Sequence, residues 1–520
     1  MKKISIYIIF ALLGLASCKK SFLDQNPLSQ GNAAGFYKTQ TDFEQALNGA
    51  YQGLRASISL GTGTSYVTAP WLMGEMRSDN TFYDYKASDR AVVNVYRENI
   101  DNFLDDKFNT ETAGMWNNNY VVISRANAIL DRIGGVTLAD SVKNRFTGEA
   151  EFLRALSYFY LVRYYGGVPL YLHAVQNQTQ AFLARSSADS VYAQIIADAT
   201  DAVQKLNPPA FPQVGRATKG SALTLLADVY MTQKKYADAE AALEKVTQMG
   251  YQLQTDYAAA FATNNKNSKE SIFEIQYSMA ILGQESSFIY WYIPRMANCT
   301  IVTGDIANTI TTYGGWNTPT QDLIGAYESG DKRLDASIAV VEGTWSSSSD
   351  FTPSAVKSIV GYTPSPGKAG RPFNKKYLHA HTLPQKTDDN WPVYRYAEVL
   401  LLLAESLNEQ GRTADALPWV NQVRGRAGLA PLTSTDQTVL RDSILHERRV
   451  ELAFENKRWL DLVRTGNAIT VMNAQGDILR PANDYLSPNS YKLTTDRLLF
   501  PIPYSETQLN TKLTQNHGYE

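Results

Sequence analysis

Cysteine and histidine are scarce in this chain, which holds 2 Cys and 5 His among 520 residues. Two cysteines allow at most one disulfide, so a chain of this length must be held by its hydrophobic core. The one close pair of histidines is His379 and His381, which could share one face of a strand. Two ligands without a third are a poor indication of metal binding. We therefore predict no metal site.

An excess of charge of one sign is also missing, because 49 Lys and Arg stand against 51 Asp and Glu. Nucleic-acid binding requires a basic stripe, and none is present, so no nucleic-acid partner is predicted. The sequence has no Gly-x-Ser-x-Gly or His-Glu-x-x-His motif, and Gly361–Lys368 has the wrong spacing for a phosphate loop. We predict no cofactor and no enzyme activity. A glycoside hydrolase, which needs only two carboxylates, stays open as an alternative.

Only the N-terminus carries a long apolar run. Lys2 and Lys3 precede an apolar stretch over residues 4–15. This run is too short to span a bilayer, which takes about 20 residues, and is typical of an export signal. The following Leu15-Ala16-Ser17-Cys18 has the form of a bacterial lipobox. We therefore predict a signal peptide over residues 1–17 and a lipid anchor on Cys18, since two or more acyl chains give stable membrane attachment.

Helical periodicity dominates the rest of the chain. Apolar residues recur at helical spacing over Asn118–Ile133 and again over Glu149–Tyr165, with glycine pairs after each segment. A second pair of segments covers Lys219–Gln233 and Tyr236–Met249, separated by a turn that can only reverse the chain. These patterns predict two antiparallel helical hairpins.

One hairpin is repeated in the sequence. The segment Ala227–Ala239 aligns without gaps on Ala404–Ala416, with alanine at both ends of each copy. Small residues at these positions allow two helices to approach closely, as in tetratricopeptide repeats. About 150 residues separate the copies in the sequence.

Two regions differ in composition from the helical segments. Gly61–Tyr85 and the stretch between the repeats are rich in aromatic residues, glycine and proline. Within that stretch Ser271–Tyr277 alternates like a strand, Tyr290–Pro294 is predicted to be extended, and Thr344–Arg371 is predicted to be a connecting loop.

The predicted fold is therefore mostly α, with tetratricopeptide-like helical hairpins as a scaffold and an irregular, short-strand-rich face for ligand binding. We expect an N-terminal part over residues 18–260 and a C-terminal part over residues 261–520, which together form one compact unit.

Five signatures in order give the chain a resemblance to the SusD/RagB family of outer-membrane lipoproteins of Bacteroidetes-type bacteria. They are Phe22–Pro27, Ala150–Ala155 with Tyr165–Leu170, Thr218–Ala222, Glu447–Glu455 with Arg458–Leu462, and the C-terminal Phe500–Pro503 with Gly518-Tyr519.

The resemblance implies a surface lid in the outer membrane that binds a glycan or an oligopeptide and delivers it to a SusC-like TonB-dependent barrel. Lys19 and Lys20 stand where surface-exported lipoproteins usually carry acidic residues. A periplasm-facing scaffold built on the repeats therefore stays open as an alternative. The charged residues of the Glu447–Leu462 signature are spaced as ion pairs on a helix surface, and a structural role is predicted for them.

The resemblance also places the ligand site. Tyr83 and Tyr85 occupy the positions of the aromatic platform in starch-binding members. Arg77, Asp79 and Asn80 could hydrogen-bond sugar hydroxyls, although Asp79-Asn80 could also form a turn. The predicted second group of ligand contacts is Trp291, Tyr292 and Trp316, among which Trp316 could equally be a loop anchor.

Overall fold

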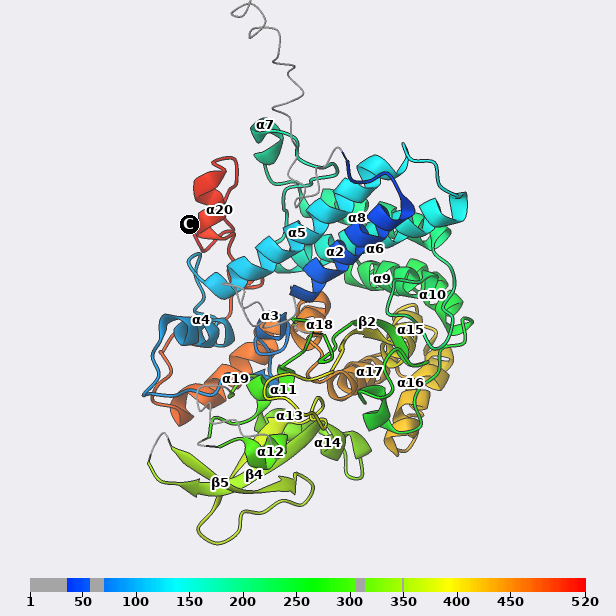
Figure 1. Ribbon diagram of the computed structural model, residues 1–520. Coiled ribbons are helices and arrows are strands. Elements are labelled where there is room, and N and C mark those ends of the chain that lie inside the picture. The colour runs from blue at the N-terminus through cyan, green and yellow to red at the C-terminus, as the bar shows by residue number, and fades with distance from the viewer. Residues whose placement is uncertain (1–34, 57–69, 282, 297, 305–313, 348–349) are drawn as a thin grey trace, which may run out of the picture.

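Nine helices of the described chain form one curved array in which each helix packs against its neighbours (Figure 1). The computed structural model describes residues 35–56, 70–281, 283–296, 298–304, 314–347 and 350–520. The predicted signal peptide and Cys18 lie outside these residues. The array consists of α2 (Gln40–Ala56), α5 (Thr110–Ile133), α6 (Asp140–Tyr165), α8 (Ala188–Lys205), α9 (Lys219–Thr232), α10 (Tyr236–Thr247), α15 (Tyr396–Glu409), α16 (Thr413–Ala427) and α17 (Gln437–Glu451).

The two predicted hairpins are confirmed. Helices α5 and α6 pack against each other, and so do α9 and α10. Helix α6 begins nine residues before the predicted start and ends at Gly166, whose φ of +74° stops the helix. The Thr218 side chain caps α9 in a reciprocal capping box with Ser221.

The two copies of the sequence repeat lie side by side, since α10 packs against α15. The four predicted small residues, Ala227, Ala239, Ala404 and Ala416, are completely buried. The turns also match, because the aligned residues Lys234 and Gly411 both have positive φ, +58° and +77°. The insertion of about 150 residues therefore loops out of an array that is continuous in space.

The irregular face holds short helices and three small sheets. Strand β4 (Ile338–Trp345) pairs antiparallel with β5 (Phe351–Ser358) on one side and β6 (Ala369–Asn374) on the other. The remaining sheets are β1 (Thr81–Phe82) with β3 (Thr318–Pro319) and β2 (Ser271–Ile275) with β7 (Trp391–Arg395).

The other helices are short or lie near the C-terminus. They are α3 (Pro70–Gly74), α4 (Val92–Asp101), α7 (Gln178–Ala181), α11 (Phe288–Tyr292), α12 (Thr300–Thr303), α13 (Gln321–Ala326), α14 (Lys332–Ser337), α18 (Arg458–Thr465), α19 (Ala468–Ala482), α20 (Tyr504–Leu509) and the 3₁₀ helices Tyr257–Ala260 and Thr495–Arg497.

Three local predictions are wrong. The segment predicted as extended, Tyr290–Pro294, begins inside helix α11, because its aromatic side chains can pack against the core from one helical turn. The predicted loop Thr344–Arg371 contains β5 and the start of β6; β5 is an edge strand with mostly exposed side chains, so it lacks a hydrophobic signal. His379 and His381 lie outside any strand.

The charged residues of the C-terminal signature form ion pairs, but these lie in the interior rather than on a helix surface. Arg395 is 2% exposed and contacts Glu270, Glu451 and Glu455 at 2.7–3.0 Å. Burial alone would raise the pKa of Glu451, yet Arg426, Arg395 and Arg333 lower it to about 2. Spacing along a helix predicts which charges meet, but burial depends on the neighbouring elements that cover them.

The C-terminal segment closes back onto the N-terminal helices. The Phe500 amide donates to the Tyr164 carbonyl at 2.7 Å, and Asn516 Nδ2 donates to the Tyr165 carbonyl at 3.0 Å. The Tyr519 hydroxyl donates to Asp105 Oδ2 at 3.2 Å. The C-terminal segment is thus fixed against the end of α6 and against Asp105, which precedes α5.

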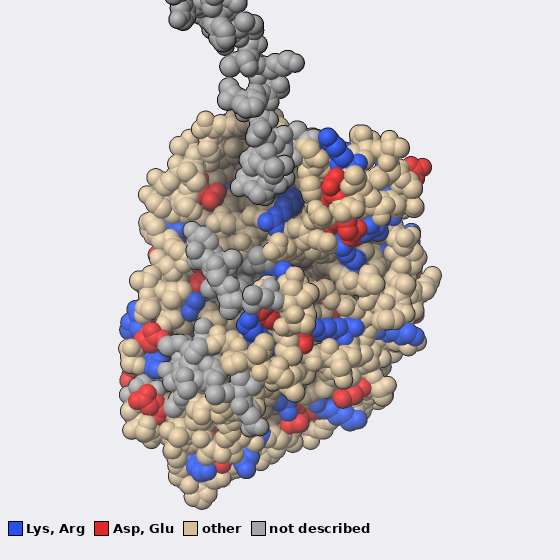
Figure 2. Space-filling view, viewed as in Figure 1, with Lys and Arg blue, Asp and Glu red and all other residues tan. Residues whose placement is uncertain are grey.

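Charges of both signs are interspersed over the face seen in Figure 2, without a large patch of one sign. Within the described part of the chain, no helix is long and apolar enough to cross a bilayer. Groups of three or more potential metal ligands are also absent from those residues. Cys299 is buried in the fold.

Candidate ligand-binding site

A pocket of about 570 Å³ opens between the segment 79–102 and helix α19 with the loop that follows it. Its volume is in the usual range of small-molecule sites, about 300–1,000 Å³. The residues that line it are mostly aromatic, aliphatic or amide-bearing: Asp79, Phe82, Tyr83, Tyr85, Glu98, Asp101, Asn102, Thr320, Gln321, Asp322, Val471, Ala474, Gln475, Ile478, Leu479, Asn483, Tyr485, Leu486 and Tyr491. We call it the Tyr485 pocket.

Two tyrosines stack in this pocket. The rings of Tyr85 and Tyr485 are parallel to within 2°, with centroids 4.0 Å apart. Tyr485 covers one face of the Tyr85 ring. The Arg90 guanidinium also lies over the Tyr85 ring, 4.9 Å from its centroid, as in a cation–π contact. Tyr485 itself is 44% exposed. The ring surface available to a ligand therefore belongs to Tyr485, and Tyr85 supports it from behind.

An unused hydrogen-bond acceptor lies in the same pocket. Gln475 Oε1, on α19, is buried and has no partner among the described residues. Buried polar atoms in folded proteins almost always have partners, and an exception is informative about missing groups. A hydroxyl or amide of a ligand could donate to this oxygen once the Gln475 side chain turns it toward the pocket.

The carboxyl groups of the Tyr485 pocket carry no unpaired charge. Asp79 accepts two hydrogen bonds of 2.7 Å from Arg458, Asp322 pairs with Arg449 at 2.5 Å, and Glu98 pairs with Arg90 at 2.6 Å. Burial raises the pKa of Asp101 to about 8, so this acid is protonated at neutral pH. The pocket is therefore suited to an uncharged ligand.

Asp101 also fixes the pocket wall. Its Oδ2 accepts the Tyr83 amide at 3.0 Å, and its Oδ1 contacts the Tyr491 hydroxyl at 3.0 Å. The Tyr83 hydroxyl donates to Asn94 at 2.9 Å and accepts from Arg295, which leaves its side chain 3% exposed. Tyr83 thus borders the pocket as a buried wall residue, whereas Tyr85 belongs to the stack.

The three predicted polar contacts are built into the interior. Arg77 is completely buried and pairs with Asp105 at 2.5 Å, while its guanidinium packs against the rings of Phe103 and Phe500. Asn80 Nδ2 donates to Glu75 at 2.9 Å. With Asp79 held by Arg458, the positions of these side chains favour a supporting role, and their predicted contacts with ligand stay predictions.

The second predicted aromatic group forms a cluster beside the pocket. Trp316 is 1% exposed and packs against Trp291 at 4.9 Å and Tyr83 at 6.0 Å. Tyr292 is completely buried, while Trp291 keeps part of its surface exposed and donates to Ser287 Oγ at 3.1 Å. The structure thus joins Tyr83, Trp291 and Trp316 into one aromatic row, of which Tyr83 alone lines the Tyr485 pocket.

Sequence reasoning missed Tyr485 and Gln475. Tyr485 is one of 31 tyrosines and lies in a polar loop, and Gln475 is one glutamine on an amphipathic helix. The spatial proximity of α19 to residues 79–102 carries no local sequence signal.

The fold and the pocket define a tetratricopeptide-type helical protein with a strand-containing face that carries an aromatic pocket. The chain belongs to the SusD family: the sequence model described as the SusD family matches residues 227–519. A second model, described as starch-binding and associating with the outer membrane, matches residues 21–231.

Individual proteins agree with this assignment. SusD-like protein P2 of Formosa agariphila is 29% identical over the full length of both chains. The starch-binding protein SusD of Bacteroides thetaiotaomicron is 24% identical, covering 76% of this chain and 77% of its own. The solved structure of a laminarin-binding SusD-like protein is 26% identical and superposes with a TM-score of 0.73, covering 93% of this chain and 100% of its own.

Proposed function

We propose that this protein is a lipid-anchored outer-membrane protein that binds a neutral glycan in the Tyr485 pocket and delivers it to a SusC-like TonB-dependent barrel. The observation that carries the proposal is the exposed ring of Tyr485, held by Tyr85 and lying in the same pocket as the unpartnered Gln475 oxygen. An aromatic face packs against the C–H face of a sugar, and nearby amides bind its hydroxyls.

Charge distinguishes between the two predicted ligand classes. An oligopeptide brings charged termini, which need partners when they leave water. The carboxylates of the Tyr485 pocket are already paired with arginines, and Asp101 is protonated, so no lining residue offers an unpaired charge. We therefore favour a neutral glycan. Relatives whose names specify laminarin and starch support the same class.

The proposed anchor is the lipid on Cys18, and the proposed orientation is outward from the cell. The match to a family model described as associating with the outer membrane supports the location. The helical array would then provide the face that docks on the barrel. The division into an N-terminal part over residues 18–260 and a C-terminal part over 261–520 also belongs to this proposal.

Calorimetric titration of the mature chain tests the ligand class directly. We expect binding to at least one oligosaccharide of a panel built from glucose, mannose, galactose or xylose, without formation of new reducing ends. Release of reducing ends would favour the hydrolase alternative, and failure to bind any panel sugar would overturn the proposal.

The location and the partner are tested on cells. Protease treatment of intact cells should remove the protein, and mild detergent should extract it together with a TonB-dependent barrel. Protection from the protease would favour the periplasm-facing scaffold. Recovery of the chain alone, at native expression with the barrel gene present, would contradict the delivery role.

A further inference from the structure

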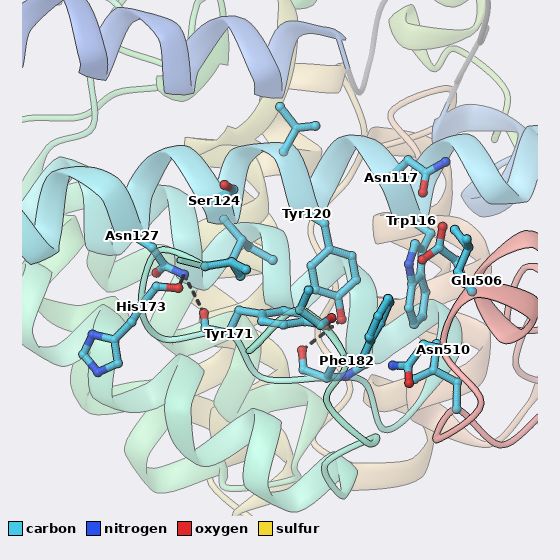
Figure 3. Close-up of a pocket in the computed structure, with 17 residues that line it drawn as sticks. Trp116, Asn117, Tyr120, Ser124, Asn127, Tyr171, His173, Phe182, Glu506 and Asn510 are labelled. Carbon is cyan, nitrogen blue, oxygen red and sulfur yellow. Dashed lines mark hydrogen bonds between the residues drawn. The ribbon is translucent and has the colours of Figure 1, made fainter. Parts of the chain in front are cut away.

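A second pocket, of about 440 Å³, lies between α5, the loop after α6 and the C-terminal helix α20 (Figure 3). None of its lining residues lines the Tyr485 pocket. Four aromatic rings take part: Trp116 and Tyr120 project from α5 toward Tyr171 and Phe182, while Glu506 and Asn510 reach in from the C-terminal segment at the Trp116 end. We call it the Phe182 pocket.

The side chains that form the walls of the Phe182 pocket are held in place by hydrogen bonds to other parts of the protein. The Tyr120 hydroxyl donates to the Pro169 carbonyl at 2.9 Å, and the Tyr171 hydroxyl donates to the Ala181 carbonyl at 2.6 Å. Asn510 Nδ2 donates to the Leu183 carbonyl at 2.7 Å, which ties the C-terminal segment to the loop that carries Phe182. Rings fixed in advance lose little conformational entropy when a ligand binds.

The chemistry of the pocket combines ring faces with one carboxylate. Among the described residues, no neighbouring cation shifts the pKa of Glu506. Burial raises the pKa of Glu506, and a hydrogen bond from the Trp116 indole lowers it. Its carboxylate can accept hydrogen bonds from hydroxyls, but it would repel a uronate or sulfate group, because no cation beside it balances the two negative charges.

We propose that the Phe182 pocket is a second carbohydrate-binding site, separate from the Tyr485 pocket, that takes a neutral sugar ring. The ring would pack against Phe182, Tyr120 and Tyr171, and its hydroxyls would donate to Glu506. The side chain of Asn117, which also lines the pocket, adds a further amide donor and acceptor. Two sites without a shared lining residue would let the protein hold one long glycan at two points, which raises the overall affinity through effective concentration.

The test weakens the first site about tenfold with Tyr485→Ala and then titrates the second. In a Tyr485→Ala background, at least one neutral oligosaccharide of the panel should still bind, with about one site per chain. Phe182→Ala or Glu506→Gln in that background should weaken this remaining binding about tenfold, whereas Trp345→Ala should not. Trp345 is 47% exposed on β4 and lies outside both pockets, so it controls for loss of an exposed aromatic ring.

The outcomes separate the two proposals. If the wild-type chain binds a sugar but Tyr485→Ala abolishes all binding, the second site is wrong and the proposed function stands. If the remaining binding is unchanged by both Phe182→Ala and Glu506→Gln, the proposal of a second site is also wrong. Glu506→Gln keeps the shape of the side chain, so a folding defect in Phe182→Ala does not decide the result. Oligogalacturonate should bind the Glu506→Gln chain more tightly than the wild type.

Discussion

The rings of Tyr85 and Tyr485 lie parallel at a centroid distance of 4.0 Å, although the two residues are 400 positions apart in the sequence. Tyr85 comes from the segment after β1, and Tyr485 comes from the loop after α19. The stack therefore joins the N-terminal and C-terminal halves at the mouth of the pocket. Any ligand that packs against Tyr485 is held by both halves at once.

Replacing Tyr485 should affect binding and leave stability almost unchanged. Loss of one stacking face costs on the order of 1–2 kcal/mol, so Tyr485→Ala should weaken glycan binding about tenfold. The side chain is 44% exposed, and its removal should barely move the melting temperature. Calorimetry beside a thermal melt measures both. Tyr230→Ala, a partly exposed tyrosine on α9 outside both pockets, is the control.

Tyr83 should behave in the opposite way. Its ring is buried and its hydroxyl bonds Asn94 and Arg295, so Tyr83→Ala should lower the free energy of unfolding by about 3 kcal/mol or more. Denaturant unfolding measures this loss. If a Tyr83→Ala chain keeps its stability but loses affinity for the glycan, Tyr83 is a ligand contact, as the sequence predicted.

The buried acid Asp101 should make stability fall with rising pH. Its pKa is about 8 in the folded chain, against about 3.9 when unfolded, so between these values the folded state holds a proton that the unfolded state has lost. The free energy of unfolding should fall by about 1.4 kcal/mol per pH unit from this group. Asp101→Asn should remove that slope, because an amide can accept from Tyr83 and donate to Tyr491. Unfolding curves at pH 4 to 8 check this, and parallel curves for both chains would contradict it.

The buried ion network around Arg395 should be essential for stability. Arg395→Met leaves Glu270, Glu451 and Glu455 without one shared partner, and breaking a buried pair costs about 3–5 kcal/mol. Arg412→Met is the matched control, because Arg412 makes only exposed ion pairs and its loss should leave stability nearly unchanged. Equal stability of the two variants in denaturant would refute the prediction.

The turn of the first repeat copy should tolerate glycine better than its own lysine. Lys234 has a φ of +58°, a conformation that costs a side-chain-bearing residue about 1–2 kcal/mol. Lys234→Gly, which copies the aligned Gly411, should raise the free energy of unfolding by up to about 1 kcal/mol. Lys245→Gly in the last turn of α10 should lower it, since glycine weakens a helix. A Lys234→Gly chain less stable than the wild type would contradict this reading of the turn.

Removal of the lipid acceptor should release the protein from the membrane. Cys18→Ala leaves no thiol in the lipobox, so the chain should move to the soluble fraction after cell lysis and high-salt washing. Immunoblots of the two fractions measure this, in a strain that lacks the partner barrel. Cys299→Ala is the control, since that thiol is buried in the fold. A Cys18→Ala chain that still sediments with outer membranes would contradict the prediction of a lipobox at Cys18.

Helical periodicity and the repeat correctly predicted the hairpins α5–α6 and α9–α10 and the tetratricopeptide-like packing, because these segments carry apolar residues at helical spacing in the sequence. Helices α2 and α8 of the array were not predicted. Strands β5 and β6 were missed because few of their side chains are both apolar and buried, and they are defined by pairing with β4 rather than by their own pattern. The Tyr485 pocket could likewise be predicted only in part. Residues 79–85 could be singled out through the family resemblance, but Tyr485 becomes a candidate only when α19 is placed beside them.

The closing contacts of the C-terminus bear on the order in which the chain can fold. Asp105, Tyr164 and Tyr165 receive hydrogen bonds from residues 497–519, which a ribosome makes after all nine helices of the array. A partly synthesised chain has its N-terminal helices but lacks the segment that completes their packing. The N-terminal helices therefore cannot complete their native contacts until synthesis has passed residue 519, so final folding follows the synthesis of this segment.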